Sequence, residues 1–402
     1  MLRVFNSLTR RKEAFRPLSG KNARLYTCGP TVYARPHLGN FRTYLYEDVV
    51  KRYLAYLGFS VKHAMNITDF DNTVLKEARK TGIPRRKLTR KFERLFRQDL
   101  RALGILPADK YPHVSQYADK MEEMVDALVA KGAAYRDKDG RVFFDVSAYP
   151  SYGKLVGQKL SSRKGKITWE EYKPWQAGDF LLWQPCGSNP EKCIRTRKGL
   201  ARPAWNIQCA AMSTDTLGSQ IDIAMGGRDN LFNHHENTRA LAGALSGKEY
   251  AKYFMHVRHL IIYRKKMSKS KGNAVLLSDI IREEHSPKMV RLLLLSVRYR
   301  YRLNYTSAYR ERMKRRYLTM KKEIAAIKKA GGKGAEDFDK MLLQAKAGFE
   351  SSMDDDFDVP AALGAVEKFL ARCSSLPISR RQAAQALALL RKFDSVLGFL
   401  PL

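Results

Sequence analysis

Residues 22–72 read "NARLYTCGPTVYARPHLGNFRTYLYEDVVKRYLAYLGFSVKHAMNITDFDN", and this stretch decides the fold class. At its start, polar and apolar residues alternate and give way to an apolar run that ends at Gly29-Pro30. This pattern predicts a strand followed by a loop. From about His37 to Gly58 the apolar residues recur at helical spacing, and residues 60–72 predict a second strand with a polar end. Strand, helix and strand in this order form a βαβ unit, so the sequence predicts an α/β protein with a doubly wound parallel sheet.

The start of the predicted helix is a candidate phosphate site. His37 and Asn40 lie where a helix follows a strand, and backbone N–H groups and the helix dipole attract phosphate there. His37 could donate to phosphate oxygens, and Gly39 would let a base or ribose approach the backbone. A helix that is merely capped after a proline-containing loop has the same pattern.

A basic loop far downstream is the second candidate. Residues 264–274 read "RKKMSKSKGNA", with lysines around two serines and a Gly-Asn end. Such a loop can neutralise a triphosphate and close over it, and charge stabilisation applied in the transition state accelerates a reaction. We expect Lys266 and Lys269 to carry this role.

The remaining chain predicts further elements around these motifs. Residues 84–135 are charged and helical in period, and residues 140–155 indicate β structure with turns. The α/β pattern returns at Trp205, with a strand ending at Gly226-Gly227 and a helix from about Asn233, and the pattern is helical beyond residue 300. The basic helix at 306–329 is either a solvated face or a phosphate-contacting one.

Composition favours a large anionic partner and a reducing compartment. Lys plus Arg is 74 against 40 for Asp plus Glu, a net charge of +34, which favours nucleic acid over a merely basic proteome. The five cysteines are few, odd in number and widely spaced, so we expect no disulfide framework and a cytoplasmic protein. The N-terminus lacks an apolar signal region, and no apolar run is long enough to span a membrane.

Taken together, "HLGN" and the downstream "KMSKS" resemble the paired nucleotide motifs of class I aminoacyl-tRNA synthetases. Finer matches resemble the cysteinyl-tRNA synthetase family in order and spacing, from residue 1 to about residue 400. They include "LYTCGPTVY", "NITDFDN", "DFLLWQP", "GRDNLFNHHEN", "YRLNYT" and "MDDDFDVPAALGAV".

The resemblance implies a Rossmann-like catalytic domain with an inserted α+β connective region and a C-terminal α-helical bundle. The expected division is 1–100 and 204–260 for the two catalytic halves, 101–203 for the insertion, 261–304 for the KMSKS and stem-contact region, and 305–402 for the helical tRNA-binding bundle. The family joins cysteine to tRNA(Cys) with ATP and Mg²⁺, and we expect a monomer.

The resemblance also implies roles for single residues. His37, Asn40, Lys266 and Lys269 would act on the ATP phosphates. Gly39, Gly226, Gly227 and Asp229 would bind the adenosine part, with Asp229 on the ribose. Thr68, Trp205 and Cys28 would contact the amino acid.

A zinc ion in this family recognises the substrate thiolate. Three ligand positions match, Cys28, Cys209 and His234, and thiolate and imidazole are suitable zinc donors. The fourth ligand of the family is a glutamate, but this chain has Thr238 there, so water or Glu236 would have to help. Two buried small cysteines would be the alternative to a metal site.

Other departures concern the amino-acid pocket. Asn206 and Gln208 lie where the family usually has His and Glu. Ala224 and Met225 lie where it usually has His and Gly. The family also usually continues beyond "LGFLPL" into an anticodon-reading domain. Three hypotheses therefore stay open: a cysteine–tRNA ligase, a paralogous ligase for cysteine or a similar small amino acid with a small amine acceptor, and a non-catalytic RNA-binding protein on the same scaffold.

Overall fold

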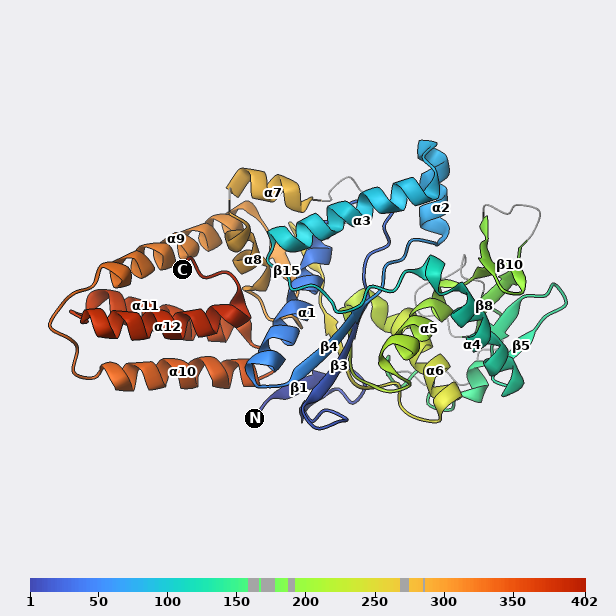
Figure 1. Cartoon of the computed structure of the whole chain (residues 1–402), viewed down its shortest axis with the longest axis horizontal. Helices are drawn as coiled ribbons and strands as arrows, with labels where there is room; N and C mark the ends of the chain where they lie inside the picture. The colour runs from blue at the N-terminus through green and yellow to red at the C-terminus, as the bar shows by residue number, and fades with distance from the viewer. Residues whose placement is uncertain (158–165, 168–177, 187–191, 268–274, 285) are drawn as a thin grey trace.

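The computed structural model describes residues 1–157, 166–167, 178–186, 192–267, 275–284 and 286–402. Figure 1 shows a parallel sheet near the middle of an elongated molecule, a helical bundle at one end and an inserted α+β unit at the other. Among the described residues, no helix is long and apolar enough to cross a membrane.

The central sheet has four parallel strands in the order β12-β11-β3-β4. They are β3 (Asn22–Thr27), β4 (Ser60–Met65), β11 (Ile221–Gly227) and β12 (Ala251–Val257). Leu25 of β3 pairs with His63 of β4 on one side and with Ile223 of β11 on the other. The predicted doubly wound α/β class is confirmed, because β3, the following helix and β4 form the expected βαβ unit.

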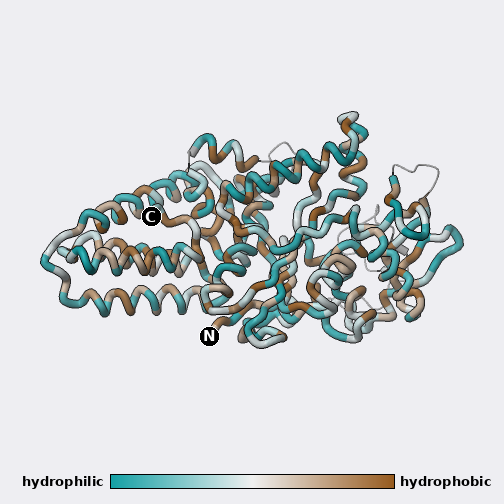
Figure 2. Tube along the Cα trace, viewed as in Figure 1, coloured by the Kyte–Doolittle hydropathy of each residue, from teal (hydrophilic) through white to brown (hydrophobic). Residues whose placement is uncertain are grey.

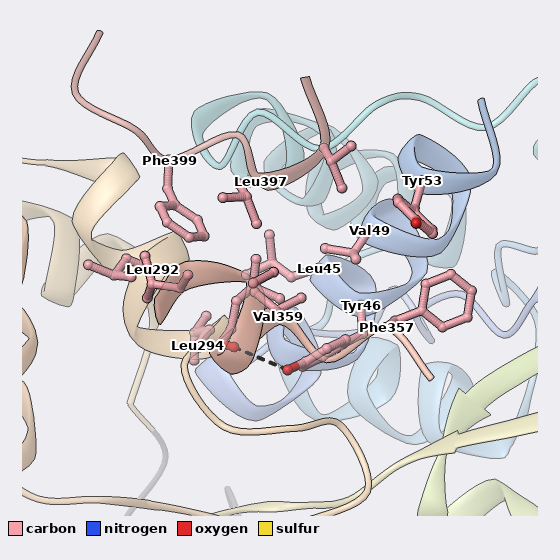
Figure 3. Packing of buried hydrophobic residues seen from close by; sticks show 14 of the residues in the cluster. Leu45, Tyr46, Val49, Tyr53, Leu292, Leu294, Phe357, Val359, Leu397 and Phe399 are labelled. Atoms are coloured by element: carbon pink, nitrogen blue, oxygen red, sulfur yellow. Dashed lines mark hydrogen bonds between the residues drawn. The ribbon is translucent and has the colours of Figure 1, made fainter. Parts of the chain in front are cut away.

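Helix α1 (Leu38–Tyr56) joins the sheet to the helical bundle. Figure 3 shows Leu45 and Val49 of α1 packed with Leu292 of α8 (Pro287–Leu295) and Leu397 of α12 (Arg380–Leu397). A fully buried ion pair between Asp48 and Arg291 adds a polar link between α1 and α8. The helix that begins at the candidate phosphate site is therefore anchored over most of its length.

The stretch between β4 and β11 contains the predicted insertion, 101–203, and the elements that flank it. Its helices are α2 (Asn72–Thr81), α3 (Arg85–Ala102), α4 (Ala118–Ala130) and α5 (Trp205–Leu217). Its sheet has the order β5-β6-β8-β10-β9, with β7 beside β8. The strands are β5 (Ala134–Arg136), β6 (Val142–Phe144), β7 (Lys166–Ile167), β8 (Asp179–Pro185), β9 (Ile194–Thr196) and β10 (Gly199–Pro203).

One disulfide contradicts the expectation drawn from the cysteine count. Cys186 and Cys193 are bonded, with their Cα atoms 6.0 Å apart, and they are only seven positions apart in the chain. Cys186 directly follows β8 and Cys193 directly precedes β9, so the antiparallel pairing of both strands with β10 brings the two cysteines together. Cys28, Cys209 and Cys373 are free thiols.

The C-terminal bundle begins after β15 (Leu303–Tyr305). Its main helices are α9 (Ser307–Lys329), α10 (Phe338–Asp354), α11 (Val359–Ser375) and α12. Figure 2 shows hydrophobic and hydrophilic residues alternating along these helices, as expected for helices with one buried face. The remaining strands and α-helices are β1 (Arg3–Asn6), β2 (Arg11–Ala14), α6 (Glu236–Ser246), β13 (Leu260–Ile262), β14 (Lys265–Lys266) and α7 (Leu277–Glu284). The domain boundaries given above stay a prediction.

Candidate functional site

A cavity of about 470 Å³ opens at the carboxyl ends of β3 and β11, where α/β sheets bind ligands. Most of the predicted site residues line it. They are Cys28, His37, Asn40, Thr68, Trp205, Cys209, Gly227, Asp229 and His234. Residues from five separate stretches of the chain therefore meet around one space.

His37 and Asn40 form a reciprocal cap at the start of α1. The backbone N–H of Asn40 donates to His37 Nδ1 over 3.3 Å, and the backbone N–H of His37 donates to Asn40 Oδ1 over 3.1 Å. Two N–H groups at the helix start are thus satisfied while both side chains still face the cavity. A Cβ atom at Gly39 would lie 3.1 Å from the His37 ring, so glycine leaves this ring its place.

The basic loop is bounded on both sides by contacts with this helix start. Met267 lines the cavity together with His37, and Leu276 forms an antiparallel β-bridge with His37. The N–H of Leu38 donates to Val275 O over 2.8 Å. Lys269 lies outside the described residues, and for Lys266 the backbone alone is described, in β14. The segment between Met267 and Val275 therefore starts and ends beside the candidate phosphate site.

The end of β11 supplies the opposite wall. Gly227 and Asp229 line the cavity, and Asp229 Oδ1 lies 4.0 Å from His259 Nδ1. A Cβ atom at Gly227 would lie 2.4 Å from Asp229 Oδ1, so a larger residue would displace this carboxylate. Gly226 lies behind the wall, where a Cβ atom would meet the His235 ring at 3.1 Å.

Two cysteines and a histidine form a compact group at the floor of the cavity. One donor atom each from Cys28, Cys209 and His234 lies within 4.8 Å of the others, and His234 Nε2 is 3.0 Å from Cys209 Sγ. Cys28 directly follows β3, Cys209 lies on α5, and His234 precedes α6. Two sulfurs and one imidazole nitrogen are donors that suit zinc, so the group fits this ion.

The thiols of this group influence each other's ionisation. Interaction with Cys28 and the neighbouring His234 lowers the pKa of Cys209 well below its usual value. Interaction with Cys209, together with burial, raises the pKa of Cys28 well above its usual value. Without a metal, the proton is therefore favoured on Cys28 and the thiolate on Cys209.

A chain of buried histidines behind Cys28 was missed by sequence reasoning. Cys28 Sγ is 3.1 Å from His235 Nε2, His235 Nδ1 is 2.9 Å from His256 Nε2, and His256 Nδ1 is 2.8 Å from Ser7 Oγ. Burial lowers the pKa of His235 well below its usual value and that of His256 to about 3, so both imidazoles are neutral. Only the second histidine of "HHEN" could have pointed to this chain.

Trp205 and Thr68 form another part of the cavity wall. The Trp205 ring stacks on His234 with the ring centroids 4.0 Å apart and an interplanar angle of 13°. Thr68 Oγ1 accepts from Asn66 Nδ2 over 3.0 Å, and Asn66 Oδ1 accepts from the Gly29 N–H over 3.0 Å. Asn66 thereby fixes the loop that carries Cys28.

Glu236 is not available as a fourth ligand, contrary to one option raised above. Its Oε1 accepts from Arg239 Nη1 over 2.9 Å, and its Oε2 accepts from the N–H groups of Leu155 and Val156 over 2.9 and 3.2 Å. Thr238 is buried, and its hydroxyl has no hydrogen-bond partner among the described residues. Of the two residues considered for the fourth position, Glu236 is thus engaged elsewhere, and the hydroxyl of Thr238 is a weak donor for zinc.

The other departures from the family pattern are also buried. Asn206 Oδ1 accepts from Asn237 Nδ2 over 2.9 Å, and Gln208 Nε2 donates to Phe70 O over 3.4 Å. Ala224 and Met225 are buried in β11. Asn206 thus has a structural partner in Asn237, a residue of the "HHEN" stretch.

A further buried carboxyl, that of Glu47, lies on α1. Both oxygens of Glu47 are buried and lack a hydrogen-bond partner among the described residues. Burial raises the pKa of Glu47 well above its usual value. The Oγ1 atom of Thr27 is 2.9 Å from His63 Nε2.

Comparison with known families gives two matches. Residues 14–315 match the family described as "tRNA synthetases class I (C) catalytic domain", and residues 348–401 match the "DALR domain". Together the two matches contain every predicted site residue and most of the helical bundle.

Similar curated proteins cover nearly the whole chain. The cysteine–tRNA ligase of Protochlamydia amoebophila (strain UWE25) is 35% identical over 99% of this chain and 86% of its own length. The enzyme of the same name from Chlamydia muridarum (strain MoPn / Nigg) is 38% identical over 99% of this chain and 88% of its own length. The cysteine–tRNA ligase of Methanosarcina mazei is 35% identical over 99% of this chain and 87% of its own length.

Solved structures share the fold at low identity. Methionyl-tRNA synthetase of Mycobacterium tuberculosis, bound to methionyl-adenylate, matches with a TM-score of 0.68 and 17% identity over 94% of this chain and 88% of that one. LeuRS of Agrobacterium radiobacter K84, in a ternary complex with tRNA, matches with a TM-score of 0.70 and 13% identity. The match covers 96% of this chain and 85% of that one.

Proposed function

Since the chain belongs to the cysteine–tRNA ligase family of class I aminoacyl-tRNA synthetases, we propose that it joins cysteine to tRNA(Cys) at the expense of ATP. The proposal rests on one observation: a single cavity is lined both by residues of the nucleotide motif and by a group of possible metal ligands. His37 and Asn40 of the nucleotide motif face it from α1, and the sulfur and nitrogen donors of Cys28, Cys209 and His234 form its floor.

The reaction has two steps in the same cavity. A carboxylate oxygen of cysteine attacks the α-phosphorus of ATP, the bond to the bridging oxygen breaks, and pyrophosphate leaves with Mg²⁺. The terminal ribose hydroxyl of the tRNA then attacks the carbonyl carbon of the adenylate, and AMP leaves. Negative charge develops on the phosphates in the first step, and the protein must stabilise this charge in the transition state.

The start of α1 is suited to stabilise this charge. His37 would donate to a phosphate oxygen through Nε2, because Nδ1 is occupied by the N–H of Asn40. The free end of the helix dipole adds positive potential. Lys266 and Lys269, from the segment whose flanks meet His37, would neutralise the β- and γ-phosphates. Asp229, at the end of β11, would accept the ribose hydroxyls.

The floor of the cavity would select the amino acid. Zn²⁺ held by Cys28, Cys209 and His234 would supply a Lewis-acid position that prefers a substrate thiolate over a hydroxyl. Trp205 would then cover the small side chain, and Thr68 would contact the amine or carboxylate. His235 fixes the position of Cys28 through its 3.1 Å contact.

A second candidate function is favoured by the residues around this floor. Five buried residues depart from the family pattern, and one of them, Gln208, lines the cleft that shares Trp205 with the cavity; they are Asn206, Gln208, Ala224, Met225 and Thr238. A paralogous ligase that activates cysteine or another small amino acid and transfers it to a small amine would explain this drift. The net charge of +34 opposes it, since a small amine needs no such field.

Amino-acid-dependent exchange of pyrophosphate into ATP tests the activation step. The proposal predicts exchange with cysteine, and with serine at a rate lower by at least about two orders of magnitude. Exchange with another amino acid in preference to cysteine would contradict the assigned substrate. For oligomeric state and compartment, a cytoplasmic monomer remains the expectation.

A further inference from the structure

The disulfide of the insertion opens onto a cleft of about 540 Å³. Cys193 lines this cleft, and the other lining residues come from the end of α2 and the start of α3, with Arg79 and Arg85 among them. Cys186 does not belong to the described lining. Cys193 is half-buried, so of the two bonded cysteines it is the one that a small molecule in the cleft would meet.

Three cations lie around this cysteine. Arg79 and Arg85 line the cleft itself, and Lys192 directly precedes Cys193 and lines an adjoining cleft that shares Arg79 with the first. No acidic side chain lines either cleft among the described residues. Arg85 is partly engaged, because its Nη1 donates to the carbonyl oxygen of Asp69 over 3.0 Å. Positive charge without a lining carboxylate attracts a small anion into the cleft.

The same charge favours the chemistry of the disulfide. Thiol–disulfide exchange begins when a thiolate attacks one sulfur of the bond, and the other sulfur leaves as a thiolate. Both the attacking and the leaving sulfur are then negative, and nearby lysine and arginine side chains stabilise thiolates. A disulfide beside Arg79 and Lys192 is therefore placed for exchange with an anionic thiol.

The strands that carry the two cysteines are held together without the disulfide. Strand β10 pairs with β8 on one side and with β9 on the other. The turn after β9 is tied to α4, because the N–H of Arg197 donates to Asp119 Oδ1 over 2.7 Å and Lys198 forms an ion pair with Asp126. The bond closes a loop of only seven positions, and a short loop restricts the unfolded chain least. Cleavage of the bond should therefore leave the fold in place.

We infer that the Cys186–Cys193 disulfide is an exchange site for small thiols that carry a carboxylate, and that the incoming sulfur attacks Cys193. The carboxylate would lie beside Arg79 and Lys192 while the thiolate reaches the bond. Free cysteine and an acidic peptide with a cysteine share this chemistry. Disulfides of cytosolic proteins are usually transient and redox-sensing, which agrees with the compartment expected for this chain.

The exchange balances over two steps. The small thiolate attacks the Sγ atom of Cys193, the bond between the protein sulfurs breaks, and Cys186 leaves as a thiolate and takes up a proton. A second small thiolate attacks the sulfur of the first one in the mixed disulfide, and Cys193 leaves as a thiolate and takes up a proton. Two electrons thus pass from two small thiols to the protein, which becomes a dithiol, and one small disulfide is released.

A count of thiols checks that the bond forms. In denaturant with a chelator, the protein purified without reductant should show three thiols, those of Cys28, Cys209 and Cys373, and the reduced protein should show five. Five thiols before reduction would overturn the inference. The reduced protein should still melt in one cooperative transition, since the strands are held by other contacts. Loss of that transition would make the bond a structural one and would also overturn the inference.

Two thiols of equal length test the role of charge. 3-Mercaptopropionate carries a carboxylate, and 3-mercaptopropanol does not. The rate at which each reduces the disulfide is measured and expressed per thiolate. We expect the carboxylate to react about tenfold faster at low salt. The difference should fall below about twofold at about 1 M salt, where charges are screened beyond about 3 Å. Equal rates at low salt would overturn the inference.

A pair of matched double variants locates the cations. R79Q/K192Q removes two charges beside the disulfide, and K340Q/K368Q removes two exposed charges from α10 and α11, at the other end of the molecule (Figure 1). The preference for 3-mercaptopropionate should fall to about threefold or less in R79Q/K192Q and stay at about tenfold in K340Q/K368Q. An equal preference in both variants would mean that the overall charge of the protein, and not the cleft, attracts the thiol.

Two single-cysteine variants test which sulfur is attacked. Cys186→Ser leaves Cys193, and Cys193→Ser leaves Cys186. Each is incubated with the disulfide of 3-mercaptopropionate, and peptide mapping by mass spectrometry separates the adduct from any on Cys28. The adduct on Cys193 should form at least about fivefold faster than that on Cys186. The reverse order would overturn the assignment.

Natural thiols identify the source of the exchange. The reduction rates with free cysteine and with an acidic tripeptide that contains cysteine are compared per thiolate, and the faster of the two is assigned as the partner. Rates for both that are no higher than that of 3-mercaptopropanol would overturn the inference. All of these measurements read thiols and adducts, so a protein that activates no amino acid still reports on this site.

Discussion

The main-chain N–H of Leu38 donates a 2.8 Å hydrogen bond to the carbonyl oxygen of Val275. This bond joins the first residue of α1 to the first described residue after the KMSKS sequence. Met267, the last described residue before the gap in that sequence, lines the same cavity as His37. The two nucleotide motifs are far apart in the chain, and their flanks nevertheless meet at one helix start.

Replacement of Lys269 tests the role of the basic loop. Lys269→Ala should slow cysteine-dependent pyrophosphate exchange by about 100-fold, the usual loss when one group that stabilises transition-state charge is removed. Cysteine binding, measured by calorimetry, should stay within twofold, because the amino-acid floor is made by other residues. An exchange rate equal to that of the unaltered protein would refute the assignment.

Two replacements of Asn40 separate its structural role from its role toward phosphate. Asn40→Asp keeps an acceptor for the His37 N–H but adds a negative charge, so stability should hold while the KM for ATP rises at least about tenfold. Asn40→Ala loses the acceptor and should lower the free energy of unfolding by about 1 kcal/mol. Denaturant titration and exchange kinetics measure the two effects. An unchanged KM in Asn40→Asp would mean that the phosphates bind elsewhere.

The group of Cys28, Cys209 and His234 predicts a metal content. The purified protein should contain about one zinc per chain, and Cys209→Ser should contain little, because two remaining donors hold zinc poorly. Elemental analysis measures both. A zinc content below about half an equivalent per chain in the unaltered protein would show that the site does not hold the ion with Thr238 in place of the usual glutamate.

Position 238 offers a gain-of-function test of the same group. Thr238→Glu should strengthen zinc retention against a chelator by at least about tenfold, since a carboxylate is a better zinc ligand than a hydroxyl. The hydroxyl that it replaces makes no hydrogen bond among the described residues. Thr238→Gln has nearly the same volume and no charge, so equal retention in the two variants would speak against ligation.

Glu47 predicts a pH-dependent stability. The folded protein holds this proton where the unfolded chain releases it, so folding takes up a proton and stability falls as pH rises above about 4.3. Glu47→Gln cannot ionise, so its advantage over the unaltered protein should grow with pH and reach on the order of 1–3 kcal/mol. Denaturant titrations at several pH values measure it. The exposed Glu336→Gln serves as the control, and an advantage that is equal at pH 4 and pH 8 would contradict the assignment.

Much of the fold was predictable because local periodicity and turn chemistry agree with the tertiary structure. The run from Asn22 to Asn72 carries a strand, a helix and a strand, and Thr306 marks a helix start that the structure also has. These elements depend on contacts between neighbours in sequence, which a single chain displays.

The parts that sequence reasoning missed depend on contacts between distant residues. Ser7, His256 and His235 meet only because β12 lies beside β11, and no spacing in the chain announces this. The Cys186–Cys193 disulfide depends on how β8, β9 and β10 pair. The grouping of Cys28 with Cys209 was expected from the resemblance alone, because neither residue lies in a short metal-binding motif.

Transfer of labelled cysteine to tRNA tests the central claim most directly. The purified protein is incubated with ATP, Mg²⁺ and labelled cysteine, first with tRNA(Cys) and then with a small amine in its place. We predict that the label appears on the 3′-terminal ribose of tRNA(Cys), in an ester that mild base hydrolyses. Formation of the adenylate with transfer only to the small amine would contradict the account and establish the paralogous ligase instead.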